Sequence, residues 1–316
     1  MKTAVVAIGG NAILKAGEEA TFDNQMRNLQ RTCSHLARMI KCGYDIVLTH
    51  GNGPQVGNIL VQNDLARRKI PPMPLDVCVA ESQGQLGYMI QQALTEALAK
   101  VNVHKVVTCL LTRVVVDPDD PAFEQPTKPV GPYYDEEEVA ELKATHNWDF
   151  IFDGRRGGFR RVVPSPRPVG IVEFSGIRRL VFGGEGQPEV VVASGGGGIP
   201  VVQRDGCYQG VDAVVDKDLA AAVLAVDVKE RLFIMLTDVD NAFLDFNSDQ
   251  PKPLGEVTAE QMRAHLEEGQ FGAGSMAPKA EAALYFLNNG GERAIITSAE
   301  RIDQALQGNA GTQIVR

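Results

Sequence analysis

Apolar residues along the chain form short continuous runs that alternate with stretches of helical spacing. Residues 3–8 and 45–49 are largely apolar runs, typical of strands buried on both faces. Between them, residues 24–41 place apolar side chains on one helical face. The same alternation predicts further strands at residues 105–111, 189–193, 231–236, 293–296 and 313–315, and further helices at residues 54–68, 82–100, 135–143, 177–182, 217–226, 259–268, 278–288 and 302–306. Strands that alternate with helices form a mostly parallel sheet covered on both faces, so we expect an α/β fold.

One stretch of the chain interrupts this alternation. Prolines cluster between residues 117 and 168, and glycines and arginines mix at residues 154–161. A segment this long without a regular pattern is typically functional or a small inserted subdomain. We therefore expect one domain over residues 1–316 with an insert at about residues 117–168, which we call the insert.

Composition and charge narrow the class of protein. The 316 residues are 44% hydrophobic and 22% charged, which is ordinary for a globular protein and excludes a disordered or collagen-like chain. A net charge of −9 disfavours a nucleic-acid partner. No run reaches about 18 apolar residues, so we expect no membrane span and a cytoplasmic protein. The five cysteines form no CxxC pair and no Cys/His cluster, so we expect reduced thiols.

Three glycine clusters each follow a predicted strand, at residues 9–11, 51–53 and 195–198. In a parallel sheet the carboxyl ends of the strands share one edge, where ligands bind. Glycines allow backbone N–H groups to approach an anion closely, and a following helix N-terminus adds its dipole. Three clusters at equivalent positions therefore favour an anion site over three unrelated turns.

The chain lacks the common nucleotide-binding and catalytic motifs. There is no GxxxxGK[ST] loop, and residues 51–57 miss GxGxxG by one position. There is no GxSxG elbow and no kinase HRD or DFG set. If phosphate binds here, lysines and backbone amides must hold it.

Three lysines stand in contexts that differ from an ordinary solvated surface. Lys128 lies between prolines in residues 126–129, Lys217 lies between Asp216 and Asp218 at a predicted helix start, and Lys279 lies where another helix begins. A lysine at a helix N-terminus does not favour the helix dipole, so another role is expected for Lys217. His50 is beside a glycine cluster, and we interpret it as structural rather than as a general base.

Eight segments resemble, in the same order, those of the carbamate kinases within the amino acid kinase family. They are residues 7–12, 50–57, 82–84 with 87–88, 115–118, 126–129, 195–200, 215–218 and 274–279. The resemblance implies an eight-stranded α/β sandwich and a homodimer. It also implies an acceptor-binding half at about residues 1–190, whose insert protrudes over the acceptor, and a nucleotide-binding half at about residues 191–316.

The resemblance also implies the reaction. ATP and carbamate would exchange a phosphoryl group reversibly to give ADP and carbamoyl phosphate, often in the direction of ATP. Mg²⁺ would be held mainly by phosphate oxygens, so no protein ligand is named. Lys128 and Lys217 would contact the transferred group, Lys279 the nucleotide phosphates, and Asp216 would orient a lysine, with a helix cap as its alternative role. Such chemistry is mainly positioning and charge neutralisation.

The remaining site residues follow from the same resemblance. Backbone amides would cradle phosphate and acceptor at Gly9, Gly10, Gly51, Gly196 and Gly197. Asn11 and Asn52, with Gly53, would orient the acceptor. Thr237, Asp238, Asp240 and Met276 would lie at the nucleotide.

One segment departs from the family pattern, and two other functions stay open. Residues 153–159 differ from the run that many carbamate kinases carry before residues 160–166, which bears on lid contacts and acceptor preference. The chain could instead be a kinase of the same fold that acts on another small carboxylate, phosphonate or phosphate. It could also be a catalytically silent, nucleotide-binding regulatory protein, which the three lysines disfavour.

Overall fold

The structure is a computed structural model that describes residues 2–15, 17–146, 148–154, 157–183, 189–246, 250–272 and 276–316. Residues 155–156 of the glycine–arginine run and residues 274–275 of the segment before Lys279 lie outside the described residues. No helix in the described ranges is both long and apolar enough to cross a membrane.

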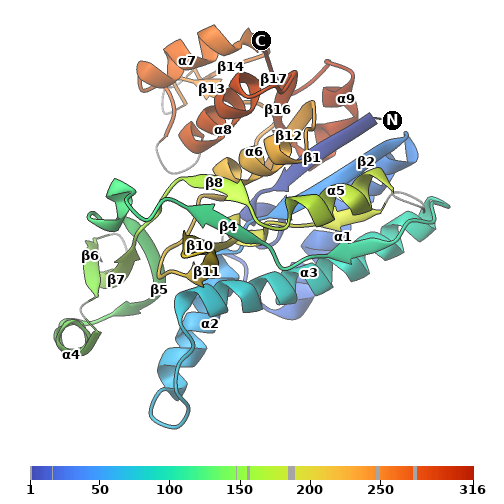
Figure 1. Cartoon of the computed structure of the whole chain (residues 1–316). Helices are drawn as coiled ribbons and strands as arrows, with labels where there is room; N and C mark the ends of the chain where they lie inside the picture. Colours follow the sequence, from blue (N-terminus) through green and yellow to red (C-terminus); the bar gives the residue numbers. More distant parts are fainter. Residues whose placement is uncertain are drawn as a thin grey trace.

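An eight-stranded sheet forms the centre of the molecule, in the order β15-β17-β16-β12-β1-β2-β9-β3 (Figure 1). Its strands are β1 (Lys2–Ile8), β2 (Tyr44–His50), β3 (Val107–Cys109), β9 (Val190–Val192), β12 (Leu232–Thr237), β15 (Glu256–Thr258), β16 (Arg293–Ser298) and β17 (Thr312–Val315). Neighbouring strands are parallel except β16 and β17. The predicted α/β fold with a mostly parallel sheet is confirmed, and β15 is the strand of this sheet that the sequence pattern did not predict.

Helices cover both faces of this sheet. Successive residues of β1 point to opposite faces, so Val5 and Ala7 belong to one apolar core and Val6 and Ile8 to the other. The first core is closed by α5 (Phe174–Phe182), α6 (Lys217–Asp227), α7 (Ala259–Glu267) and α8 (Ala277–Asn288). The second is closed by α1 (Phe22–Lys41), α3 (Leu75–Lys100) and α9 (Ile302–Leu306). Two dry cores on one sheet make the three layers of the sandwich.

The starts of two helices show how local sequence sets their bounds. Thr21 caps α1, since its side chain accepts from the N–H of Asn24 at 3.3 Å. Helix α3 begins at Leu75, so its predicted start at residue 82 is wrong. The apolar face simply continues towards the N-terminus through Leu75, Cys78 and Val79, all buried.

Two smaller sheets lie beside the central one and were not predicted. A four-stranded sheet in the order β11-β10-β4-β8 joins β4 (Arg113–Val116), β8 (Pro168–Ile171), β10 (Ile199–Arg204) and β11 (Cys207–Gly210). A three-stranded sheet, β5-β7-β6, with one helix makes a projecting lobe in the insert (Figure 1). Its elements are β5 (Lys128–Tyr134), α4 (Glu136–His146), β6 (Asp149–Asp153) and β7 (Gly158–Val163).

Short elements complete the described chain. Helix α2 (Gly53–Ala66) follows β2, and the hairpin β13 (Phe243–Leu244) and β14 (Lys252–Pro253) follows β12. The 3₁₀ turns are η1 (Gly10–Ala12), η2 (Pro121–Phe123), η3 (Gly195–Gly197) and η4 (Ala299–Arg301). Because β1, β2 and β9 are parallel neighbours, the turns and loops after them meet at one edge of the sheet.

Candidate active site

A cavity of about 840 Å³ lies at the carboxyl edge of the central sheet, and we call it the reaction cavity. The loops after β1 and β2 line it, together with β5, the start of α6 and the start of α8. The predicted residues that line it are Gly10, Asn11, Gly51, Asn52, Gly53, Lys128, Gly196, Asp216, Lys217 and Lys279. The fold therefore brings the three lysines and the glycine-rich turns to one place.

Asp218 holds two of these lysines together. Its Oδ1 accepts from Lys217 Nζ at 2.7 Å, and its Oδ2 accepts from Lys279 Nζ at 3.1 Å. The Asp218 side chain is 5% exposed, and those of Lys217 and Lys279 are 17% and 9% exposed. We call these three residues the buried lysine cluster. Asp218 was not among the predicted site residues, although it flanks Lys217 in the sequence.

The charges of the buried lysine cluster shift each other's protonation. Burial favours the neutral form of Asp218, yet the two lysines outweigh it and lower the pKa of the carboxyl group below its ordinary value. The pKa of Lys279 is lowered, first by burial and then by the positive charge of Lys217, with Asp218 opposing both. Two ammonium groups share one carboxylate here, so the cluster carries an excess positive charge suited to an anion.

Asp216 and Lys128 form a second, more open part of the site. Asp216 caps α6, because its Oδ1 accepts from the N–H groups of Asp218 and Leu219 at 2.9 and 3.3 Å. Its Oδ2 lies 3.7 Å from Lys128 Nζ, and the Lys128 side chain is 46% exposed. The Asp216 side chain therefore caps the helix through one oxygen and pairs with a lysine through the other.

Two polar side chains of the insert besides Lys128 line the reaction cavity, those of Tyr133 and Arg160, and neither was among the predicted site residues. Arg160 and Tyr133 face it from β7 and β5. The Arg160 guanidinium donates to the Gly131 carbonyl at 3.3 Å and lies 5.4 Å from the Tyr133 ring centre. The signal for Arg160 was its place in the glycine–arginine run.

The glycines of the 195–198 cluster are required by close packing. Gly196 and Gly197 have φ values of 68° and 90°, a region that side chains disfavour. A Cβ added to Gly196 would lie 2.1 Å from Asn52 Nδ2, and one added to Gly197 would lie 2.1 Å from the Val215 carbonyl oxygen. This loop therefore locks the turn after β2 to the segment that leads into α6.

The expectation that amides of this edge cradle phosphate needs correction at three glycines. The N–H of Gly9 donates to Leu236 O and that of Gly51 to Ile8 O, both at 3.0 Å. The N–H of Gly197 donates to Ser194 O at 3.2 Å. These donors already have acceptors, because they continue the strand ladders and close a turn. The N–H groups of Gly9, Gly51 and Gly197 are therefore not vacant donors for a phosphate.

The two asparagines also have protein partners. Asn11 Nδ2 donates to Asp238 Oδ2 at 2.9 Å, and Asn52 Nδ2 donates to Ser82 Oγ at 2.8 Å. Their side-chain amides are therefore oriented by the fold. Ser82 belongs to one of the segments that carry the family resemblance, and its contact with Asn52 gives a structural role to that serine.

Most of the residues expected at the nucleotide do not line the reaction cavity. Of the described residues in this set, Gly196 and Lys279 line the cavity, whereas the other members lie outside its lining: Gly9, Gly197, Thr237, Asp238, Asp240 and Met276. Thr237 Oγ1 donates to Asp238 Oδ1 at 3.0 Å. Asp240 accepts from Ser298 Oγ at 2.6 Å and lies 3.4 Å from Arg301 Nε. Met276 precedes α8.

His50 is a buried structural residue at the end of β2. It is 1% exposed, and its Nδ1 lies 3.0 Å from the Gly51 carbonyl oxygen. Burial lowers its pKa to about 4, so the ring is neutral at pH 7. A Cβ on Gly195 would lie 2.3 Å from His50 Nε2, so the ring packs directly on that loop.

Comparisons with known proteins agree over nearly the whole chain. A sequence profile of the amino acid kinase family matches residues 2–298. The carbamate kinase of Thermococcus kodakarensis is 48% identical, with both chains covered completely, and that of Pyrococcus furiosus is 47% identical over 99% of each chain. A solved structure of the carbamate kinase of Giardia lamblia bound to AMP-PNP is 42% identical. It superposes with a TM-score of 0.94, covering 99% of this chain and 98% of that one.

Proposed function

The chain belongs to the amino acid kinase family, and we propose that it is a carbamate kinase. It transfers a phosphoryl group reversibly between ATP and carbamate, giving ADP and carbamoyl phosphate. The observation that carries the proposal is the meeting of Lys128, Lys217 and Lys279, from three separate elements, around one cavity at the sheet edge. Similarity to carbamate kinases extends over both halves of the chain, which supports the same assignment.

The charge of the site suits this reaction. A transferring phosphoryl group carries negative charge on its oxygens, and fixed cations in a partly dry site stabilise it. The oxygen of carbamate is already anionic, so the acceptor needs no general base. The burial of His50 and its pKa of about 4 fit a neutral, structural ring beside such a reaction.

We assign the lysines distinct tasks. Lys217 and Lys128 approach the transferred phosphoryl group from different elements, one from α6 and one from the insert. Lys279 contacts the nucleotide phosphates. Asp218 positions Lys217 and Lys279, because each of its oxygens accepts from one of them. Asp216 fixes the start of α6 and orients Lys128.

The two substrates approach from different sides. The acceptor lies between the turns after β1 and β2, at Gly10, Asn11, Gly51, Asn52 and Gly53. The nucleotide extends towards the end of β12 and the start of α8, at Thr237, Asp238, Asp240 and Met276. Gly196 lies in the cavity wall between the two substrates, whereas Gly9 and Gly197 pack behind that wall, against Leu236 and Val215.

Any Mg²⁺ at this site would be held mainly by the phosphate oxygens of the nucleotide. When bound, it neutralises charge on the phosphate oxygens. The described residues contain no group of three or more His, Cys, Asp or Glu side chains that could hold a metal ion. Asp216 and Asp218 both face lysines, so the chain's own role is to position the phosphates. We further propose a cytoplasmic homodimer that runs mainly towards ATP.

One coupled assay tests the proposal. Purified protein with Mg²⁺ and ADP should form ATP from carbamoyl phosphate, and Lys217→Ala serves as the inactive control. Acetyl phosphate and other small acyl phosphates serve as alternative donors. ATP formation from one of those and not from carbamoyl phosphate would identify a different kinase of this fold. Calorimetric ADP binding without any turnover would identify a silent nucleotide-binding protein.

A further inference from the structure

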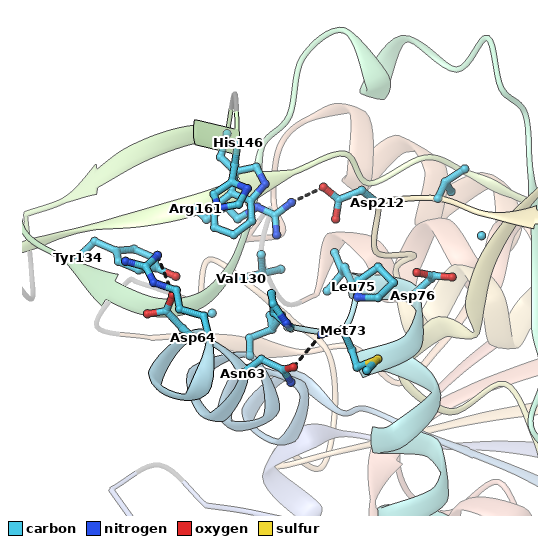
Figure 2. A pocket seen from close by; sticks show the side chains of 18 residues that line it. Asn63, Asp64, Met73, Leu75, Asp76, Val130, Tyr134, His146, Arg161 and Asp212 are labelled. Carbon is cyan, nitrogen blue, oxygen red and sulfur yellow. Dashed lines mark hydrogen bonds and ion pairs between the residues drawn. The ribbon is translucent and has the colours of Figure 1, made fainter. Parts of the chain in front are cut away.

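A second cavity, of about 500 Å³, lies between the insert and the helices α2 and α3. Figure 2 shows Tyr134, His146 and Arg161 of the insert on one side and Asn63, Leu75 and Asp76 on the other. It lies across β5 from the reaction cavity. Tyr133 lines the reaction cavity and Tyr134 the second one, as expected for successive residues of a strand.

Apolar and aromatic side chains make up much of its wall. They include Leu60, Met73, Leu75, Val130, Tyr134 and Trp148. A concave site of this size and lining is typical of a pocket for a small organic molecule, with a few polar groups that select it. The nature of those polar groups decides which molecule fits.

The two arginines of the cavity already have carboxylate partners. Arg161 donates to Asp212, and its guanidinium lies 3.9 Å from the Trp148 ring centre. Arg67 lies 3.3 Å from Asp64 and 3.5 Å from Glu141. Neither guanidinium therefore offers an uncompensated positive charge to a ligand.

Asp76 differs from the other charged residues of the cavity. Within the described ranges, its carboxylate has no hydrogen-bond or ion-pair partner. It lies in the first turn of α3. Its Oδ2 packs against Gly210, where an added Cβ would lie 1.9 Å away, so the side chain is held against the loop before Asp212. The uncompensated charge of this cavity is therefore negative.

We propose that the second cavity binds a small organic cation, a primary amine on an apolar body. The ammonium group pairs with Asp76, and the apolar body lies against Leu75, Val130 and Trp148. An anion of the same shape would meet Asp76 and arginines that are already neutralised. Val130 and Gly131 line both cavities, so the ligand would lie one strand away from Lys128.

The test uses a built-in reporter. Trp148 is the single tryptophan of the chain and lines this cavity, so its fluorescence reports occupancy directly. Three probes with one apolar body and different charge are titrated: 4-phenylbutylamine, 4-phenylbutanol and 4-phenylbutyrate. We expect saturable binding of the amine at least about tenfold tighter than of the alcohol, with the carboxylate weakest. Calorimetry on the same protein confirms the order.

A pair of variants locates the charge that selects the amine. Asp76→Asn should bring the amine and the alcohol to within about twofold of each other. Glu81→Gln, an exposed position on the same helix, should leave the preference unchanged. The proposal fails if 4-phenylbutyrate binds most tightly, if the amine shows no saturation up to about 10 mM, or if Asp76→Asn keeps the preference. The probe series on the unaltered protein decides the charge question even where a variant folds poorly.

Discussion

Two regions of the site present the same kind of side chain in contrasting ways. The buried lysine cluster is built on the main sheet and its helices, and its lysine side chains are 17% and 9% exposed. Lys128 is built on the insert, and its side chain is 46% exposed beside Asp216. The cluster is held by direct hydrogen bonds to Asp218, whereas the insert is joined to the body by the packing of β5 on α2 and by the Arg161–Asp212 pair.

The two regions place their cations in different ways: the buried lysine cluster is fixed before a substrate binds, whereas the position of Lys128 depends on the position of the insert. Cations fixed in a nearly dry site stabilise developing charge without rearranging during the reaction. A half-exposed cation on a separate small sheet depends on how that sheet sits on the body. The consequences for activity, stability and local opening should therefore differ between the two regions.

The largest effect is expected from removing the lysines. Lys217→Ala and Lys128→Ala should each lower kcat by roughly 10²–10³, the usual cost of losing one charge-stabilising donor. Lys143→Ala, exposed on α4, is the control. Steady-state kinetics on the folded variants measures this, and a loss below about fivefold at both positions would remove the assignment.

Arginine substitutions sharpen the same comparison. Gly51 lies close to Lys217, since an added Cβ there would be 3.2 Å from Lys217 Cδ. A larger guanidinium should not fit, so Lys217→Arg should be nearly as inactive as the alanine variant. Lys128→Arg, in more open surroundings, should recover about tenfold over its alanine variant. Equal rescue at both positions would show that the two environments do not differ.

Acid should weaken the sheet edge through His50. Its pKa is about 4 in the fold and about 6.5 unfolded, so the unfolded chain binds more protons between these values. The free energy of unfolding should therefore fall as pH drops below about 6.5, by up to about 3 kcal/mol near pH 4. His50→Asn should lose this part of the slope. Urea unfolding at several pH values measures it, and identical slopes in both proteins would contradict the burial argument.

Two aspartates two residues apart should differ in stability. Asp218→Asn leaves two buried lysines without a carboxylate, which should lower the free energy of unfolding by about 1–3 kcal/mol. Asp216→Asn keeps a good helix cap and breaks a long ion pair with the half-exposed Lys128, so the loss should stay below about 1 kcal/mol. Chemical denaturation of the two variants provides the comparison, and a larger loss for Asp216→Asn would reverse it.

The smallest effect concerns the attachment of the insert. Asp212 is 56% exposed beside the buried Arg161 side chain, so water can partly replace its carboxylate and its loss should cost less stability than the loss of Asp218. Asp212→Asn should raise hydrogen exchange of the amides in β5 and β7 by about two- to fivefold, with β1 unchanged. An increase spread evenly over both regions would mean that the insert and the body open together.

The sequence predicted the frame of the site because parallel strands followed by glycines mark one sheet edge. It could not rank Asp216 and Asp218, which flank Lys217 symmetrically. The difference comes from a long-range contact: Lys279, 61 residues from Asp218, packs against Asp218, so this aspartate and not Asp216 is buried between two lysines. The resemblance located Gly9 and Gly51, but their amide partners depend on how the strands pair.

The unpredicted sheets have a different cause. Strands β4, β8, β10 and β11 are short, and prolines open or interrupt two of them. Strands β4 and β8 pair over a long range, so no local pattern marks them. Strands β10 and β11, in contrast, form a hairpin whose Asp205-Gly206 turn is a local signal that the strand prediction missed. The early start of α3 was visible in the sequence, because Leu75, Cys78 and Val79 keep the spacing of its buried face.

The crowded loop at Gly195–Gly198 has a consequence for mutational scanning and directed evolution of this protein. Any side chain at Gly196 collides with the Asn52 amide, and any at Gly197 collides with the Val215 carbonyl group. Loss of activity on substitution at these positions would therefore reflect disrupted packing between β2, β9 and α6, and not a lost contact with a substrate. Variants that alter substrate choice should accordingly be sought in the more open wall formed by Tyr133 and Arg160, where a side chain can change without forcing two strand ends apart.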